Sequence, residues 1–158
     1  MVYLIVGQRD AGKTKKIISL QSQFGGDGIC MPKVFSDSGK FLGYNIRRLS
    51  RSETLPFVRC GHCLPPAWKQ IDQCGDFSFS ATGIDFAEAA VSDLLHKNIT
   101  PLFIDEIGPL ELKGRGFNQL VLRLLAGRSD LYLTVRLTLL ASLIRTYALT
   151  AYSILTCN

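Results

Sequence analysis

The sequence has no stretch of about 18 consecutive apolar residues, the length that a membrane-spanning helix needs. Its most apolar part, residues 131–156, is interrupted by Arg136 and Arg145, so we expect it to form elements of a soluble protein and no membrane span. The sequence also lacks blocks of lysine and arginine, since 13 acidic residues are interspersed among the basic ones. Its net charge is +5. This pattern gives no clear nucleic-acid site, and binding of nucleotide phosphates would account for the mild excess of positive charge.

The N-terminus also lacks the marks of a secretion signal, which are a basic segment, an apolar segment and a small-residue cleavage site. The five cysteines are an odd number, which argues against a disulfide framework and favours reduced thiols in the cytoplasm. No internal repeat or low-complexity tract is present. We therefore expect residues 1–158 to form a single cytoplasmic domain, long enough to bury a core of its own.

The clearest motif that is present is G-x-x-x-x-G-K-[ST], the phosphate-binding loop or Walker A motif. The apolar run at residues 2–6 predicts a buried strand before it, and Ile17, Leu20 and Phe24 follow at the spacing of one helix face. In this arrangement the backbone N–H groups and the positive end of the helix dipole face the phosphates. The predicted nucleotide-binding residues are Gly7, Gln8, Arg9, Asp10, Ala11, Gly12, Lys13 and Thr14, of which Lys13 reaches the β- and γ-phosphates and Thr14 binds Mg²⁺.

A second apolar strand, expected at residues 101–104, runs directly into Asp105 and Glu106. A short apolar strand that ends in an acid is typical of the position that organises Mg²⁺ in phosphate-loop NTPases. At the carboxyl end of a parallel strand, the Asp105 carboxylate would lie beside the loop, near Thr14. Glu106 is a candidate general base for an attacking water, and the alternative is that it opens a surface loop.

Arg136 follows a third expected core strand, residues 131–135. A cation at this edge of the sheet could neutralise charge that develops on the γ-phosphate, and a surface salt bridge is an equal alternative. The sequence therefore proposes three catalytic residues, Lys13, Glu106 and Arg136, with Thr14 and Asp105 as the Mg²⁺ ligands.

The remaining periodicity predicts helices at residues 82–97, 117–125 and 140–147. The first of them would begin at Thr82, where Thr82-x-x-Asp85 resembles a capping box. Further strands are expected at residues 29–35, 41–46, 55–58, 77–79 and 152–156, and residues 60–76 are expected to be irregular. The turn at residues 36–40 would join two of these strands into an inserted β-hairpin. Strands that alternate with helices indicate an α/β fold with a mostly parallel central sheet flanked by helices.

The pair Cys60-x-x-Cys63 has the spacing of metal ligands, and Cys74 lies nearby in the sequence. A structural Zn²⁺ site needs four ligands, which Cys60, Cys63 and Cys74 could supply together with His62 or Cys30. A second C-x-x-C motif is missing, so a loop of reduced thiols is the main alternative. A redox pair is a weaker alternative, because the motif does not open a helix after a strand.

Three segments together resemble the thermophile-type, or cancer-related, nucleoside-triphosphatase family: residues 7–14, residues 102–112 and the strand that ends at Val135-Arg136. The run Asp-Glu-Ile-Gly-Pro-Leu-Glu-Leu at residues 105–112 is much more specific than the phosphate loop alone. The resemblance implies a single-domain phosphate-loop fold of the RecA-like kind. It also implies slow, Mg²⁺-dependent hydrolysis of ATP, GTP and other nucleoside triphosphates to the diphosphate and phosphate. By the family pattern, Lys13 and Thr14 hold phosphate and metal, Asp105 organises the metal and Glu106 is the base.

Two other functions stay open from the sequence. A nucleotide or small-molecule kinase would use the same loop and Mg²⁺ but pass the γ-phosphoryl group to a hydroxyl acceptor; Glu106 beside Asp105 favours water instead. A nucleotide-dependent switch or adaptor would use the cysteine segment as a metal-held docking element. Nothing in the motifs reads the base of the nucleotide, because a phosphate loop contacts phosphates alone.

Overall fold

The computed structural model describes residues 1–157 and places the chain in an α/β fold with one sheet of 10 strands. Five of these strands run parallel, in the spatial order β10-β1-β9-β8-β2. Their bounds are Tyr152–Thr156, Val2–Gly7, Leu131–Arg136, Leu102–Ile107 and Asp27–Cys30. The phosphate loop therefore follows β1, and Asp105 lies within β8, with β9 between the two strands.

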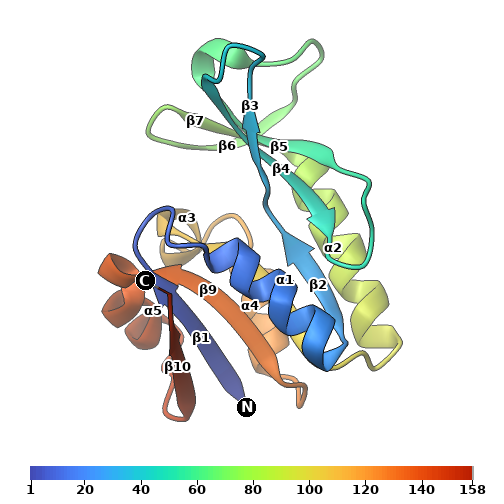
Figure 1. Ribbon diagram of the computed structural model, residues 1–158, viewed down its shortest axis with the longest axis vertical. Helices are drawn as coiled ribbons and strands as arrows, with labels where there is room; N and C mark the ends of the chain where they lie inside the picture. The colour runs from blue at the N-terminus through green and yellow to red at the C-terminus, as the bar shows by residue number, and fades with distance from the viewer. Residues whose placement is uncertain (158) are drawn as a thin grey trace.

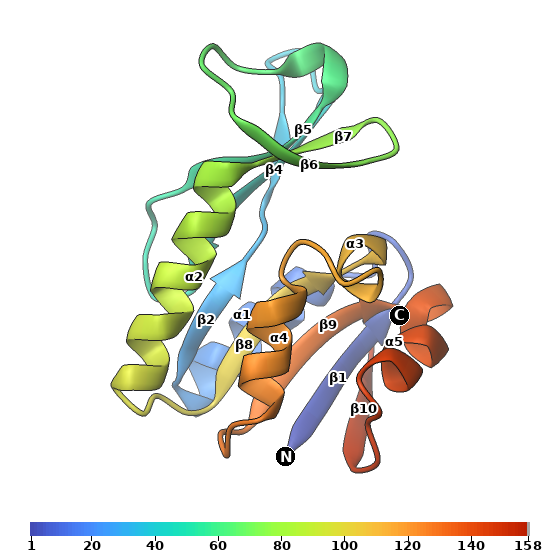
Figure 2. The same ribbon diagram turned by 180° about the vertical axis from the view of Figure 1, so that it is seen from behind.

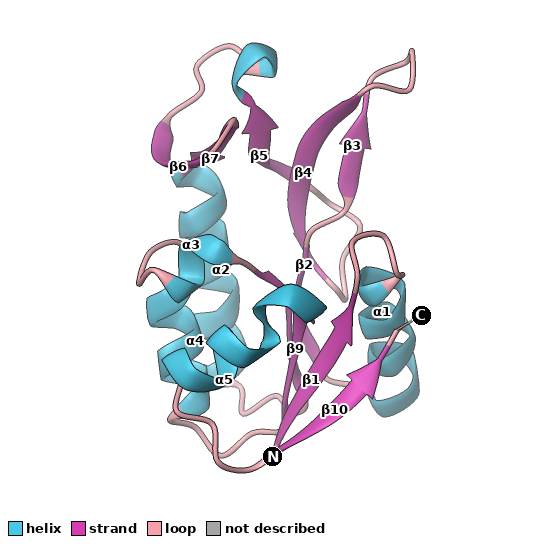
Figure 3. Ribbon diagram, turned by 90° about the vertical axis from the view of Figure 1, so that its left-hand side faces the viewer, coloured by secondary structure: helices cyan, strands magenta, loops and turns pink. Residues whose placement is uncertain are grey.

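Helices cover both faces of this parallel sheet (Figure 3). Helix α1, Lys13–Phe24, packs on one face, and α2, Ala81–His96, α4, Asn118–Leu125, and α5, Leu140–Thr146, lie on the other. Because side chains alternate along a strand, β1 contributes Leu4 and Val6 to one core and Ile5 to the second core under α1. Burial on both faces is the reason that these strands are nearly continuous apolar runs in the sequence.

The segment between β2 and α2, residues 31–80, is called the insertion here, and it is larger than the predicted hairpin. The hairpin itself is present, since β3, Lys33–Phe35, pairs antiparallel with β4, Phe41–Arg48. Beyond β4 the antiparallel part of the sheet continues through β5, Leu55–Cys60, β7, Phe77–Ser80, and β6, Gln70–Cys74. These strands form the upper part of the molecule in Figures 1 and 2, above the parallel strands.

Four local expectations are wrong. Residues 60–76 contain β6 and the 3₁₀ turn η1, Gly61–Cys63, and β6 pairs antiparallel with the strand that follows it, β7, across the turn at residues 75–76. Helix α2 is capped by the Ser80 hydroxyl, which accepts from the Gly83 N–H at 3.0 Å, and not by Thr82. The single strand expected at residues 29–35 is divided into β2 and β3, and a short helix, α3, Pro109–Leu112, follows β8. Phe24, expected on the buried face of α1, is 53% exposed.

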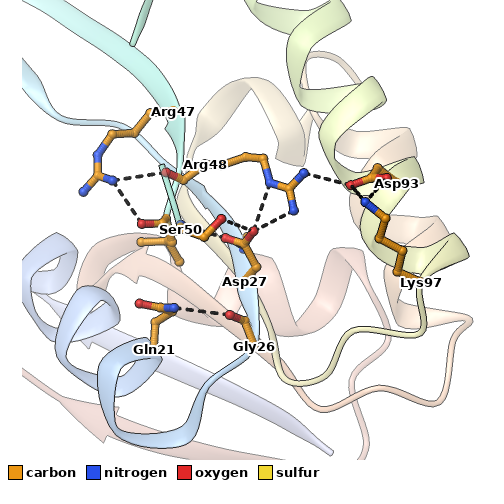
Figure 4. Close-up of polar contacts among 10 residues, drawn as sticks. Gln21, Gly26, Asp27, Arg47, Arg48, Ser50, Asp93 and Lys97 are labelled. Carbon is orange, nitrogen blue, oxygen red and sulfur yellow. Dashed lines mark hydrogen bonds and ion pairs between the residues drawn. The ribbon is translucent and has the colours of Figure 1, made fainter. Parts of the chain in front are cut away.

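A cluster of polar side chains joins the insertion to the parallel sheet (Figure 4). Asp27 of β2 accepts from the Arg48 guanidinium at 2.7 Å and from the Ser50 hydroxyl at 2.5 Å. Arg48, at the end of β4, also contacts Asp93 of α2 at 2.8 Å. Asp27 is 5% exposed, so its charge depends on these partners. The cluster fixes β4 and α2 to the strand next to β8.

Among the described residues, no helix is long and apolar enough to cross a membrane.

Candidate functional site

The segment between β1 and α1 forms a tight loop at the end of the parallel strands nearest the insertion (Figure 1). Gly12 has a φ of 80°, in the left-handed region where a residue without a Cβ is favoured, and it leads directly into α1. Lys13, only 6% exposed, turns back over the loop and donates from Nζ to the Gln8 carbonyl oxygen at 2.7 Å and to that of Gly7 at 3.3 Å. The loop thus holds an ammonium group where the phosphates of a nucleotide would arrive.

The Asp105 carboxylate lies beneath this loop and is 1% exposed. Thr14 Oγ1 donates to Asp105 Oδ2 at 2.8 Å, and Thr134 Oγ1 donates to Asp105 Oδ1 at 2.6 Å. Burial raises the pKa of Asp105 above its ordinary value, and the hydrogen bonds from the two threonines oppose this shift. Hydroxyl and carboxylate oxygens are hard ligands, so the adjacent Thr14 and Asp105 oxygens are a donor set that fits Mg²⁺.

Glu106 has a φ of 62°, which is rare for a residue with a side chain and is stabilised here by its neighbours. The register between β8 and β9 shifts at this point, between Ile104 and Ile107. The Glu106 N–H donates to Thr134 Oγ1 at 2.6 Å, and the Glu106 carboxylate accepts from Arg136 Nε at 3.3 Å. This distortion turns the Glu106 side chain out of the sheet toward the loop.

A cavity of about 320 Å³ lies between the loop, the ends of β8 and β9, and the insertion. Its charged walls carry five basic side chains and two acidic ones, namely Arg9, Lys13, Lys15, Lys33, Arg136, Asp10 and Glu106. Lys33 pairs with Asp10, which leaves a positive excess around the loop. Such a cavity suits a polyanion of triphosphate size.

The structure brings most of the site residues expected from the sequence to this cavity. Those that line it are Arg9, Asp10, Gly12, Lys13, Thr14, Glu106 and Arg136. Gly7 and Gln8 contribute the backbone oxygens that bind Lys13, and the Ala11 N–H donates to the Gln8 oxygen at 3.3 Å. Asp105 lies under the cavity wall, against Thr14. Their catalytic and binding roles stay predictions.

Several residues of the site were missed by sequence reasoning. Thr134 had a signal, because it is the only threonine or serine in the apolar strand Leu131–Arg136, and it is fully buried. Tyr44, Lys33, Met31 and Pro32 had none, since they reach the cavity from the insertion. No local pattern indicates that the insertion lies over the loop.

In the described part of the chain, the cysteine segment does not bring the expected metal ligands together. No group of three or more His, Cys, Asp or Glu side chains there could hold a metal ion. Cys60, Cys63 and Cys74 are half-buried free thiols on β5, η1 and β6. The Zn²⁺ site that the spacing allowed therefore has no support in this geometry.

Comparison with known proteins agrees with this arrangement. The model of a family described as NTPase matches residues 2–158. The chain belongs to this NTPase family. The structure is similar to the crystal structure of THEP1 from the hyperthermophile Aquifex aeolicus, with a TM-score of 0.72 and 16% identity over 100% of this chain and 90% of that one. No curated protein matches the chain.

Membership of the NTPase family confirms the resemblance found in the sequence and supports nucleoside-triphosphatase activity in general. At 16% identity, the likeness to THEP1 shows a common α/β fold and no more. The expected fold class is confirmed, with a mixed sheet flanked by helices.

Proposed function

We propose that this chain hydrolyses nucleoside 5′-triphosphates, ATP and GTP among them, to the diphosphate and phosphate with Mg²⁺. The observation that carries the proposal is the contact of 2.8 Å between Thr14 Oγ1 and Asp105 Oδ2, directly beside the buried ammonium of Lys13. This pairing of loop hydroxyl and strand-end acid, from residues 91 positions apart, is the arrangement that phosphate-loop NTPases require.

The residues of the site would have distinct roles in binding the nucleotide and the metal. The loop N–H groups and Lys13 bind the β- and γ-phosphates, so that Lys13 exchanges the Gly7 and Gln8 carbonyl oxygens for phosphate oxygens. Thr14 and Asp105 would hold Mg²⁺. When bound, Mg²⁺ supplies positive charge that stabilises the phosphoryl group in transfer.

Glu106 and Arg136 lie at the γ-phosphate end of this site. The Glu106 carboxylate faces the cavity and is partly exposed, so it can accept a proton from a water molecule there. Arg136, whose Nε contacts Glu106 at 3.3 Å, brings a guanidinium to the same place and can stabilise the charge that develops on the γ-phosphoryl group in transfer. Together they favour attack by water on the γ-phosphorus.

The proposal is tested by release of inorganic phosphate from ATP, GTP, CTP and UTP with Mg²⁺ and no added acceptor. We expect release from several of the four nucleotides by the wild-type chain and none above background by Lys13→Ala. Lys16→Ala is the matched control, because Lys16 is an exposed lysine of the same helix outside the cavity. Equal release by Lys13→Ala and the wild type would overturn the assignment of the loop.

A further inference from the structure

A second cavity of about 210 Å³ opens beside the first and shares part of its wall. The two cavities have Arg9, Met31, Tyr44, Glu106 and Arg136 in common. The second cavity includes none of the first-turn residues of α1, such as Lys13 and Thr14. It therefore lies on the far side of Glu106 and Arg136 from the helix that binds the phosphates.

This position excludes the base of a bound nucleotide as the occupant. In a phosphate loop the α- and β-phosphates lie against the loop and the start of the helix, and the γ-phosphate lies beyond Lys13. The nucleoside is attached at the α-phosphate, which is the opposite end of the chain of phosphates from Glu106. A molecule in the second cavity would instead face the γ-phosphorus, where an attacking group has to lie.

The walls of the second cavity are mostly aromatic and aliphatic. Phe57 of β5 stacks on Phe117 with ring centroids 5.1 Å apart and an interplanar angle of 19°, and both rings are buried. Half-buried Phe77 and Phe79 of β7 form the side that belongs to the insertion, and Leu110 of α3 belongs to the opposite side. Flat aromatic walls are suited to a flat ring system.

Three of the four charged side chains of this cavity, Glu106, Glu111 and Arg136, are already paired, and the fourth, Arg9, belongs to the phosphate loop. Glu111 is 5% exposed and accepts from the Gly108 N–H at 2.9 Å and the Phe117 N–H at 3.1 Å. Glu106 and Arg136 contact each other. An uncharged ligand therefore fits better than an ionic one, and a volume below the roughly 300–1,000 Å³ of drug-sized sites suits one or two rings.

We propose that this cavity binds a small uncharged aromatic or heteroaromatic alcohol and that the chain transfers the γ-phosphoryl group to its hydroxyl. This inference rests on nucleoside-triphosphate binding at the first cavity, as proposed above. The alcohol oxygen attacks the γ-phosphorus and forms the new P–O bond. The bond to the β,γ-bridging oxygen breaks, and its electron pair leaves with the nucleoside diphosphate. The alcohol proton passes to the Glu106 carboxylate.

The first test uses [γ-³²P]ATP, Mg²⁺ and four alcohols with different ring systems: adenosine, uridine, 3-pyridinemethanol and 2-naphthalenemethanol. Labelled phosphate on an alcohol and labelled inorganic phosphate are measured in the same reactions. We expect at least one alcohol to become labelled, at a rate at least tenfold above that of Lys13→Ala. Release of phosphate with no label on any of the four alcohols would overturn the inference and leave hydrolysis intact. A lack of both products would overturn the proposed function as well.

The second test locates the alcohol. Cys74 lies on the wall of the second cavity and is half-buried, whereas Cys63 lies in η1 outside it. We expect the alcohol that becomes labelled in the first test to slow alkylation of Cys74 by iodoacetamide at least threefold and to leave alkylation of Cys63 unchanged, as measured by peptide mass spectrometry.

A substitution gives an independent measurement. Cys74→Phe, which fills the cavity, should lower the ratio of labelled alcohol to labelled inorganic phosphate at least tenfold, and Cys63→Phe should not. Unprotected Cys74 together with an unchanged ratio in Cys74→Phe would place the acceptor elsewhere and overturn the inference.

Discussion

At the scale of single residues, Thr134 connects the two acids of the site. Its hydroxyl donates to Asp105 at 2.6 Å and accepts from the Glu106 N–H at 2.6 Å, and the side chain is fully buried. Thr134 touches neither cavity, so it is a positioning residue. It holds Glu106 in its unusual backbone conformation while it orients the carboxylate that faces Thr14.

Replacing Thr134 by valine should therefore affect both stability and turnover. Valine has nearly the same shape but leaves Asp105 Oδ1 and the Glu106 N–H without partners, which costs about 1–3 kcal/mol of unfolding free energy. We expect a lower kcat as well, with nucleotide affinity changed less. Thr134→Ser keeps the hydroxyl and should restore most of both properties. Chemical denaturation and steady-state kinetics measure them, and a serine variant as poor as valine would contradict this role.

Glu106→Gln tests the proposed base. The amide has the size of the carboxylate but cannot take a proton from water, so phosphate release should fall by roughly 10² or more. Nucleotide binding, measured by calorimetry with a non-hydrolysable analogue, should remain near the wild-type value because Lys13 and the loop are unchanged. Normal turnover in this variant would show that Glu106 merely occupies a loop.

Arg136 has two possible roles, and the variant Arg136→Ala distinguishes stabilisation of transition-state charge from a purely structural ion pair with Glu106. If its guanidinium stabilises charge on the γ-phosphoryl group in transfer, Arg136→Ala should lower kcat by roughly 10² and leave the nucleotide Kd within a few-fold of the wild type. Arg115→Ala removes another exposed arginine that is paired with an acid, Asp72, away from the loop, and serves as the control. Unchanged kcat for Arg136→Ala would leave only the contact with Glu106.

At the scale of elements, one buried carboxylate, that of Glu111, holds the segment from Gly108 to Asn118 in its conformation. Glu111 accepts from the Gly108 and Phe117 N–H groups, and so connects the start of α3 to the start of α4. Burial raises the pKa of Glu111 above its usual range, and these backbone hydrogen bonds oppose the shift. The segment forms one wall of the second cavity, so its order controls the shape of that cavity.

Glu111→Ala should loosen this segment. The two N–H groups lose their acceptor in a buried place, which should lower the free energy of unfolding by about 2–4 kcal/mol. Hydrogen exchange should rise at Gly108 and Phe117 more than in β1. Glu53→Ala, at an exposed glutamate of the insertion, is the control and should change neither quantity. Unchanged exchange at Gly108 would show that other contacts hold the segment.

At the scale of the whole molecule, the cluster around Asp27 holds the insertion over the phosphate loop (Figure 4). Burial works against ionisation of Asp27, but hydrogen bonds from Ser50, the Gly28 N–H and Arg48 outweigh it and hold the pKa of Asp27 below its ordinary 3.8. A pKa that is lower in the folded than in the unfolded chain gives stability that is fully present above the unfolded value. This stability is lost as the pH falls through the folded value.

Asp27→Asn should therefore destabilise the fold in a pH-dependent way. At pH 7 the variant leaves Arg48 without its buried partner, at a cost of about 2 kcal/mol of unfolding free energy. The difference in unfolding free energy from the wild type should shrink as the pH falls below 3.8, the ordinary pKa of the carboxyl group in the unfolded chain, toward the lower pKa of the folded carboxylate. Asp85→Asn, at an exposed acid of α2, should show no difference at either pH. If the difference in unfolding free energy between Asp27→Asn and the wild type stays constant with pH, the effect comes from the shape of the side chain and not from its charge.

The sequence by itself determined the parts whose physical cause is local. The loop from Gly7 to Thr14 follows from its own spacing, and the parallel strands follow from apolar runs that must be buried on both faces. The sequence placed Asp105 directly after a strand at residues 101–104; β8 in fact continues through Asp105 to Ile107, but the expected contact with Thr14 is present because the carboxyl ends of parallel strands lie at one edge of a sheet.

Tertiary structure alone decided which distant segments complete the site. The parallel pairing of β2 with β8, with Asp27 opposite Leu102, depends on a partner that no local pattern specifies, whereas β6 and the cap at Ser80 have partners close in the sequence. Tyr44 and Lys33 reach the cavity because the insertion extends the sheet and lies over the loop. The left-handed backbone of Glu106 depends on Thr134 in a neighbouring strand. Packing and the need to satisfy buried polar groups decide which side chains meet across a sheet. The spacing of residues in the sequence specifies neither of them.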